Sequence, residues 1–208
     1  MCSNILKKGS FILLLILFQL TKLDLVLAET IDQENIFHRG FINYLKGDFS
    51  NAIQVWEPIA QEGHSSAQYF LGILFKNGMG VKVNLEKAGF WFRESARQGD
   101  PGAQYFLADF LYAGKGMPQN KTLAAFWYMM SAEQDYPDSQ FMIGKMYASG
   151  IGIQKDLVSA YIWLSLSNFN GIEGSKGYLK TITEHLPEDD LIKARMQIRN
   201  RLSRFSGG

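Results

Sequence analysis

Residues 65–100 read SSAQYFLGILFKNGMGVKVNLEKAGFWFRESARQGD, and the pattern returns as PGAQYFLADFLYAGKGMPQNKTLAAFWYMMSAEQDY over 101–136 and PDSQFMIGKMYASGIGIQKDLVSAYIWLSLSNFNGI over 137–172. The three blocks are each 36 residues long and align without gaps. Repetition at such a period is typical of stacked arrays, in which each repeat packs mainly against its neighbours. Residues that recur at one place in every copy are therefore interpreted first as structural, and only then as candidates for catalysis or binding.

The spacing within each block predicts two helices joined by a glycine turn. In the first block, Ala67, Leu71 and Phe75 place an apolar stripe on a first helix. Gly78 and Gly80 follow, and a glycine just past a helix end accepts a positive φ angle. An Asn or Asp side chain then predicts the N-cap of a second helix, which contains a recurring Ala and Trp. In the three copies the cap, the Ala and the Trp are Asn84, Ala88 and Trp91; Asn120, Ala124 and Trp127; and Asp156, Ala160 and Trp163. The sequence therefore predicts an all-α chain of stacked helix pairs.

The recurring pattern A-x-x-x-L-G-x-x-[FY]-x-x-G-x-G, then an Asn or Asp cap, A-x-x-W-[FY] and A-x-x-G resembles the Sel1-like repeat, a relative of the tetratricopeptide repeat. The resemblance implies an α/α solenoid of helix-turn-helix repeats. A shortened copy is expected in residues 29–64, where Tyr44, Trp56 and Gly63 follow the same order. Residues 173–208 are expected to form C-terminal capping helices, because the last repeat of a solenoid has an unpaired face.

The first 28 residues have the order of a secretory signal peptide. Two lysines precede the apolar run 11–20, and Ala28 ends the segment with a small residue suited to cleavage. We therefore expect export to the periplasm or the medium, with cleavage near Ala28. The alternative is an uncleaved N-terminal membrane anchor, which Lys22 and Asp24 disfavour because a charge is costly at membrane depth. No integral membrane span is expected in the mature chain.

Charge and composition argue against several functional classes. The chain has 21 basic and 20 acidic residues, so no excess of positive charge indicates nucleic-acid binding. Cys2 is the only cysteine and would leave with the leader, so the mature chain would contain no disulfide. His38, His64 and His185 lack ligand-spaced partners, and we interpret them as solvated or capping residues. We expect no metal, no cofactor and no catalytic residue, and we assign the acidic run 188–190 and the arginines after it to the first turn and the solvated face of a capping helix.

The strongest functional candidate is the side of each first helix that points away from its apolar stripe. A helical wheel with about 100° per residue brings aromatic and apolar side chains to that side, where a concave groove of stacked first helices can hold a peptide or a partner helix. The candidate partner-binding residues are Tyr69, Phe70 and Ile73 in the first copy, Tyr105, Phe106, Asp109 and Tyr112 in the second, and Phe141, Met142 and Lys145 in the third. The alternative is that the aromatic members belong to the core between repeats, since both sides of a solenoid helix touch neighbours.

The resemblance also implies a protein-binding role, because members of this family commonly scaffold membrane-associated or envelope complexes. We therefore expect an exported adaptor that binds one or more proteins of unknown identity along its concave face. A second hypothesis is a structural component of an envelope machine, such as a motor or an export complex. A third is a secreted enzyme of the β-lactam-binding type known among cysteine-rich relatives, which the lack of cysteines in the mature chain disfavours.

Overall fold

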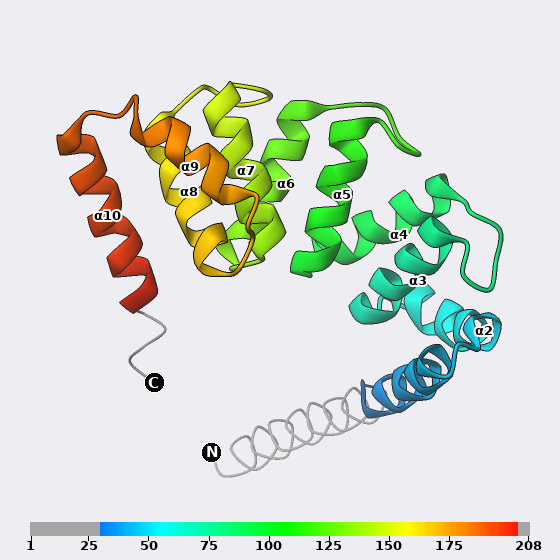
Figure 1. The fold of residues 1–208 in the computed structure, drawn as a ribbon. Helices are drawn as coiled ribbons and strands as arrows, with labels where there is room; N and C mark the ends of the chain where they lie inside the picture. The colour runs from blue at the N-terminus through cyan, green and yellow to red at the C-terminus, as the bar shows by residue number, and fades with distance from the viewer. Residues whose placement is uncertain (1–29, 204–208) are drawn as a thin grey trace, which may run out of the picture.

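The structure, a computed structural model, describes residues 30–203, so the expected leader over 1–28 lies outside the described residues. Every regular element in that range is a helix, which confirms the predicted all-α solenoid. Residues 30–45 are helical, and the chain continues through α2 (Phe49–Gln61), α3 (Ser65–Asn77), α4 (Leu85–Arg97), α5 (Pro101–Ala113), α6 (Lys121–Glu133), α7 (Pro137–Ser149), α8 (Leu157–Phe169), α9 (Ser175–Thr183) and α10 (Glu188–Ser203). These helices form a curved stack (Figure 1), and none within residues 30–203 is long and apolar enough to cross a bilayer.

The predicted caps and glycine turns delimit helices of equal length, 13 residues each from α3 to α8. At the start of α4, the Asn84 side chain accepts a hydrogen bond of 2.9 Å from the Lys87 amide, and Asn120 caps α6 through Leu123 at the same distance. Such a side chain satisfies one of the free N–H groups in the first turn. At the end of α3, Gly78 has a left-handed backbone with φ of 68°, which glycine adopts without the steric cost of a side chain.

Small residues bring the helices into close contact. A Cβ atom on Gly72 of α3 would lie 2.5 Å from the Phe92 ring of α4, so any larger residue would push the pair apart. The inter-helix turn also docks on the preceding repeat, because a Cβ on Gly116 would collide with the Leu85 carbonyl group. Glycine at these positions therefore sets both the spacing within a pair and the stacking of one pair on the next.

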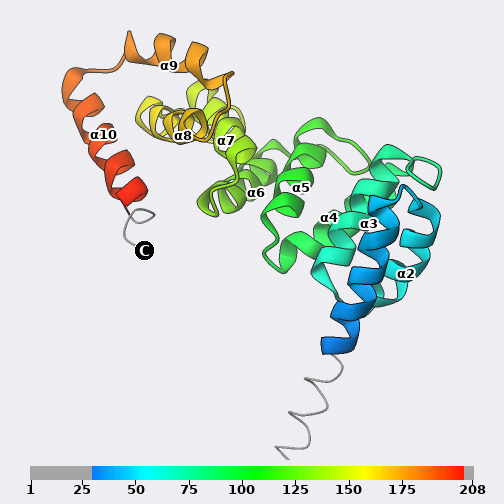
Figure 2. The ribbon, with the colours of Figure 1, turned by 60° about the horizontal axis from the view of Figure 1, so that its bottom comes forward.

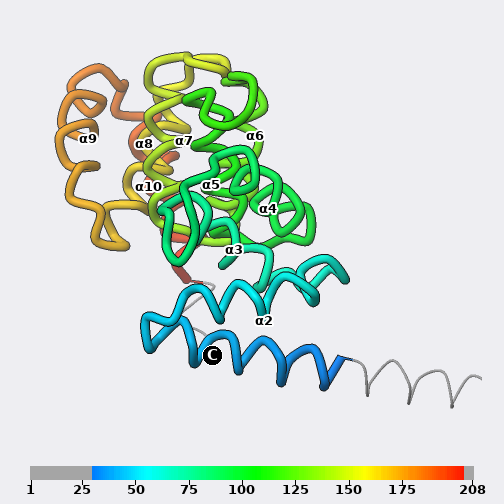
Figure 3. The backbone as a smooth tube through the Cα atoms, turned by 90° about the vertical axis from the view of Figure 1, so that its right-hand side faces the viewer, coloured from blue at the N-terminus to red at the C-terminus, as the bar shows by residue number. Residues whose placement is uncertain are grey.

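A buried tryptophan packs between the first two helices, residues 30–45 and α2. Residues 30–45 and α2 run side by side at one end of the stack (Figure 3), and Trp56 of α2 is wholly buried between them. Its indole N–H donates to the Phe37 carbonyl at 3.1 Å, which satisfies the polar atom of a buried ring. Gly40 lies against the indole, and a side chain there would collide with it.

Buried glutamines tie successive repeats together. Gln104 of α5 is 1% exposed and donates to the Ala96 carbonyl of α4 at 3.3 Å, while its oxygen accepts from Gln134, just after α6, at 2.9 Å. The same relay recurs one repeat earlier at Gln68, which donates to the Ala60 carbonyl and accepts from Gln98, and one repeat later at Gln140. Each glutamine is a second donor to a carbonyl oxygen near the end of a second helix; the Ala96 oxygen, for example, also accepts from the Gly99 amide at 3.0 Å.

The last helix turns back on the stack. Figure 2 shows that α10 diverges from α9, and it packs against α8. Arg201 of α10 donates to the Glu133 carbonyl at 2.9 Å and to the Asp135 carboxylate at 3.3 Å, and its guanidinium carbon lies 4.8 Å from the centre of the Trp163 ring. The expectation of a wholly solvated face for the arginines of this helix is therefore wrong for Arg201, because the reversal of the chain points it at the turn between α6 and α7.

Candidate functional site

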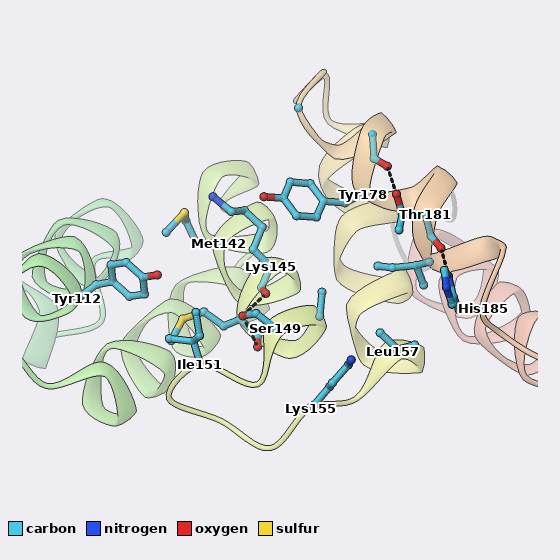
Figure 4. A pocket seen from close by; sticks show the side chains of 15 residues that line it. Tyr112, Met142, Lys145, Ser149, Ile151, Lys155, Leu157, Tyr178, Thr181 and His185 are labelled. Carbon is cyan, nitrogen blue, oxygen red and sulfur yellow. Dashed lines mark hydrogen bonds between the residues drawn. The ribbon is translucent and has the colours of Figure 1, made fainter.

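A pocket of about 690 Å³ lies across the layer of first helices, where α7 is flanked by α5 and α9. Figure 4 shows Tyr112 of α5 and Tyr178 of α9 extending toward each other from opposite sides, with Met142 and Lys145 of α7 between them. The volume falls in the range of protein sites for small ligands or inserted side chains. The lining residues are Tyr112, Met142, Lys145, Met146, Ala148, Ser149, Ile151, Lys155, Leu157, Gly174, Gly177, Tyr178, Thr181, Ile182 and His185.

Helical periodicity presents one face of α7 and one face of α9 to this pocket. Met142, Lys145 and Met146 are three and four positions apart, so they share a face of α7. Tyr178 and Ile182 are four positions apart in the same way on α9. The pocket therefore has walls on rigid helices, and the segment between α7 and α8 closes one end of it with Ile151 and Lys155.

One position of α9 in the pocket lining lacks the aromatic ring that the earlier copies carry. In the earlier copies an aromatic side chain reaches over the next first helix, so that Tyr69 packs against Gly102 and Phe141 against Gly174. The corresponding position of α9, 36 residues beyond Phe141, is Gly177. A Cβ atom built on Gly177 would have no other atom within 4 Å. One residue of the pocket lining therefore lacks the aromatic ring that the preceding repeats carry at the same register.

The polar groups of the pocket are mainly hydrogen-bond donors. The hydroxyls of Ser149 and Thr181 donate to carbonyl groups of their own helices, so they are already satisfied. The Lys145 ammonium lies 5.0 Å from the centre of the Phe141 ring and 5.8 Å from that of Tyr178, a cation–π arrangement. No Asp or Glu is among the residues that line the pocket.

Three of the ten predicted partner-binding residues line this pocket, namely Tyr112, Met142 and Lys145. Phe141 lies at its edge, where its ring centre is 5.9 Å from that of Tyr178. The structure thus brings the candidates of the third copy together with one from the second. Their contact with a partner stays a prediction.

Phe70 has a different surrounding, at the N-terminal end of the stack. Its ring centre lies 5.2 Å from that of Trp56, 5.4 Å from Tyr44 and 5.5 Å from Phe41. Phe37 adds a further ring at 5.9 Å. Phe70 therefore packs in an aromatic cluster with α2 and residues 30–45, which cover the side that the helical wheel left open.

Tyr69, Phe106 and Tyr105 form a continuous row of rings between the repeats. Ring centres are 6.2 Å apart from Tyr69 to Phe106 and 5.2 Å from Phe106 to Tyr105, and Tyr136 continues the row at 5.3 Å. Burial raises the pKa of Tyr69 and of Tyr105 from 10.0 to about 12, because the ionised phenolate would lose solvation there. This row is half-buried and contributes to the packing of one repeat on the next.

The two remaining candidates lie outside the pocket lining. Ile73 is half-buried against the main hydrophobic core. Asp109 faces Lys115, with a carboxylate oxygen 4.0 Å from the ammonium nitrogen. An exposed ion pair at that distance contributes little to stability.

The contribution of α9 to the pocket was not predicted from the sequence. The repeat pattern lapses after Gly171, so Tyr178 and Ile182 were assigned only to a capping helix. A signal was present in the register, since Tyr178 lies 36 residues beyond Met142 and 72 beyond Phe106. Extending the 36-residue count into α9 would have identified one wall of the pocket.

Two of the histidines make hydrogen-bond contacts at helix ends. His64 directly precedes α3 and caps it. Its Nδ1 accepts from the Ala67 amide at 3.2 Å and its Nε2 lies 3.3 Å from a Glu34 oxygen, so its predicted capping role is confirmed. Just after the end of α9, His185 Nδ1 lies 2.8 Å from the Thr181 carbonyl oxygen. Within residues 30–203 there is no group of three or more His, Cys, Asp or Glu side chains placed to hold a metal ion.

Comparison with protein families finds the Sel1 repeat, which matches residues 65–100, 101–136 and 137–167. Comparison with curated proteins finds no match. A Sel1 repeat protein from Oxalobacter formigenes is similar in structure, with a TM-score of 0.64 and 27% identity over 68% of this chain and 58% of that one. A protective antigen present in uropathogenic Escherichia coli strains has a TM-score of 0.67 and 28% identity over 73% of this chain and 33% of its own.

The chain thus spans a little over half the length of the first of these proteins and a third of the second. The cysteine-rich protein B of Helicobacter pylori matches with a TM-score of 0.51 and 19% identity, over 64% of this chain and 95% of that one. At this identity the likeness shows the fold alone.

Proposed function

Because this chain belongs to the Sel1-repeat family, whose members are generally protein-interaction scaffolds, we propose that it binds a partner protein on its first-helix face, the surface formed by α3, α5, α7 and α9. The observation that carries the proposal is the pocket between α7 and α9. It combines apolar walls from Met142, Met146 and Ile182 with two lysines, and its lining includes Gly177, where the earlier copies carry an aromatic residue. Apolar walls with a few placed polar groups are typical of recognition sites.

The test is a substitution that fills the pocket without disturbing the fold. Gly177→Phe restores the aromatic residue of the earlier copies at a position where a Cβ meets no other atom. Replacing a glycine inside a helix also favours helix formation. We expect the variant to keep its helical circular dichroism and to lose partner capture in crosslinking from the cells that produce the protein.

Thr183→Phe is the matched control, because Thr183 is an exposed residue of α9 outside the pocket lining. It adds a ring of the same size to the same helix and should leave capture unchanged. Equal capture by the native protein and by Gly177→Phe would show that the partner does not use the pocket, and the proposal would then be abandoned.

We also propose that the chain acts after export, as an adaptor in the periplasm or outside the cell. The support is the leader-like order of residues 1–28, in which lysines precede an apolar run and Ala28 supplies a cleavage position. Fractionation followed by intact mass measurement tests this. We expect an extracytoplasmic chain that begins at Glu29, and a full-length membrane-bound chain would favour the N-terminal anchor instead.

A further inference from the structure

The pocket concentrates positive charge in a chain that is nearly neutral. The whole sequence has a formal net charge of +1, yet the pocket lining contains two lysines, Lys145 and Lys155, and no carboxylate. Among the described residues, neither lysine has an acidic partner within 4.0 Å; the contacts of Lys145 are with aromatic rings. The positive charge of the pocket is therefore not neutralised within residues 30–203.

Two carboxylates near the pocket residues in sequence, those of Asp156 and Asp109, are engaged elsewhere. Asp156 follows Lys155 directly, but its oxygens accept from the Val158 and Ser159 amides and from the Ser159 hydroxyl. These bonds lower the pKa of Asp156 against the effect of burial, and they hold the carboxylate at the start of α8. Asp109, near Tyr112 in the sequence, faces Lys115 at 4.0 Å. Both acids lie outside the pocket lining. A ligand that carries a carboxylate would therefore supply the acceptor that the two lysines lack.

The rest of the lining is suited to a bulky apolar group. Met142 and Met146 have flexible side chains that adapt to the shape of a guest, and Ile151, Leu157 and Ile182 add branched walls. A free inorganic anion would leave this apolar surface uncovered. A peptide with both acidic side chains and one large apolar side chain would satisfy the lysines and fill the volume at once.

We propose that the pocket binds an acidic peptide segment of a partner protein, which inserts one large apolar side chain between α7 and α9 and places its carboxylates near Lys145 and Lys155. This inference rests on the proposed function and specifies the chemistry of the partner. Steering by the lysines makes the interaction weaken as the salt concentration rises.

The experiment measures fluorescence anisotropy of labelled synthetic peptides with the full chain. One peptide carries a central Phe flanked by Asp and Glu, the second has the same Phe flanked by Lys, and the third is the acidic peptide with Ala in place of Phe. We expect tight binding of the first peptide alone. Lys145→Gln and Lys155→Gln should each weaken it about tenfold, as expected for loss of one charged contact.

Lys176→Gln is the matched control, because Lys176 is exposed on α9, lies outside the lining and changes the net charge equally. Circular dichroism verifies that each variant is folded. Equal binding of the basic peptide, equal affinity in all three lysine variants, or no binding of the acidic peptide would overturn the inference. If Gly177→Phe still abolishes capture of the cellular partner in those cases, the proposed function stands and only the ligand class is wrong; if capture survives Gly177→Phe, the proposed function fails independently.

Discussion

Tyr128 of α6 has a wholly buried side chain whose hydroxyl has no hydrogen-bond partner among the described residues. The same place is occupied by Phe92 in the preceding copy and by Leu164 in the following one, both 0% exposed. Burying an unpaired hydroxyl is unfavourable, because the group leaves its water partners without replacement. At this residue the interior of the solenoid accommodates the ring and gains nothing from the hydroxyl.

We therefore expect Tyr128→Phe to raise the free energy of unfolding by about 1 to 3 kcal/mol, since the substitution removes the unsatisfied group and keeps the ring. Urea denaturation followed by circular dichroism measures the change. Phe92→Tyr is the reciprocal variant and should destabilise the protein. A loss of stability in Tyr128→Phe would mean that the hydroxyl has a partner.

Tyrosine ionisation predicts how stability depends on alkaline pH. The pKa of Tyr69 and of Tyr105 is raised from 10.0 to about 12 in the folded protein, chiefly by burial, while the unfolded chain has the ordinary value. Above pH 10 the unfolded state releases these protons more readily, so stability is complete below pH 10 and is lost as the pH rises toward 12.

A urea midpoint series between pH 9 and pH 12 should show this decline, and tyrosinate absorbance should appear late in the folded protein. The double variant Tyr69→Phe and Tyr105→Phe should have a shallower decline, because it removes two of the groups that titrate. Identical slopes in both proteins would contradict the assignment.

At the scale of the elements, buried glutamine side chains bind the C-terminal ends of the second helices. Gln104 bridges the Ala96 carbonyl of α4 and Gln134, which directly follows α6, and Gln68 does the same one repeat earlier. Each buried amide thus connects two second helices through the first helix between them. The side chain serves register as well as stability, because its bonds form only when the neighbouring pairs are stacked correctly.

Gln104→Leu keeps the approximate volume and removes both hydrogen bonds. We expect it to lower the free energy of unfolding by about 1 to 3 kcal/mol, because the Ala96 carbonyl and the Gln134 amide lose a partner. Chemical denaturation is the measurement. Gln154→Leu, at an exposed position of the turn after α7, is the control and should change stability by less than about 0.5 kcal/mol. Similar losses in the two variants would contradict a specific role for the buried relay.

At the scale of the whole molecule, the two ends of the stack are closed in different ways. Residues 30–45 cover the N-terminal end with an aromatic cluster around Trp56 and Phe70. At the other end α9 continues the stack, while α10 packs on α8 and contacts the turn after α6 through Arg201. The pocket lies at this end of the stack, where α9 neighbours α7.

Arg201→Gln should therefore release α10 locally. We expect faster amide hydrogen exchange in residues 188–203, and altered Trp163 fluorescence, because the guanidinium covers that ring and binds the Asp135 carboxylate. Exchange in α3 to α5 should stay unchanged. Arg199→Gln, at an exposed position of the same helix, is the control, and equal exchange in both variants would show that Arg201 does not anchor α10.

The sequence by itself determined the helices, their caps and their turns, because these depend on residues close together in the chain. Asn84 caps the helix that follows it, Gly78 ends the helix that precedes it, and both features recur after 36 residues. Recurrence also removed the glycine turns from the list of candidate sites, since a feature present in every copy is explained by stacking.

Only the tertiary structure decided which faces are covered and where a pocket remains. A helical wheel places Phe70 and Met142 at equivalent positions, yet Phe70 is enclosed by rings from residues 30–45 while Met142 lines the pocket beside α9. The difference arises from the segments on either side of the repeats. Residues 30–45 cover Phe70 at the N-terminal end, whereas α9 at the other end has Gly177, which carries no side chain to cover the pocket. Burial is a property of the assembled stack, so no local pattern could predict it for these two residues.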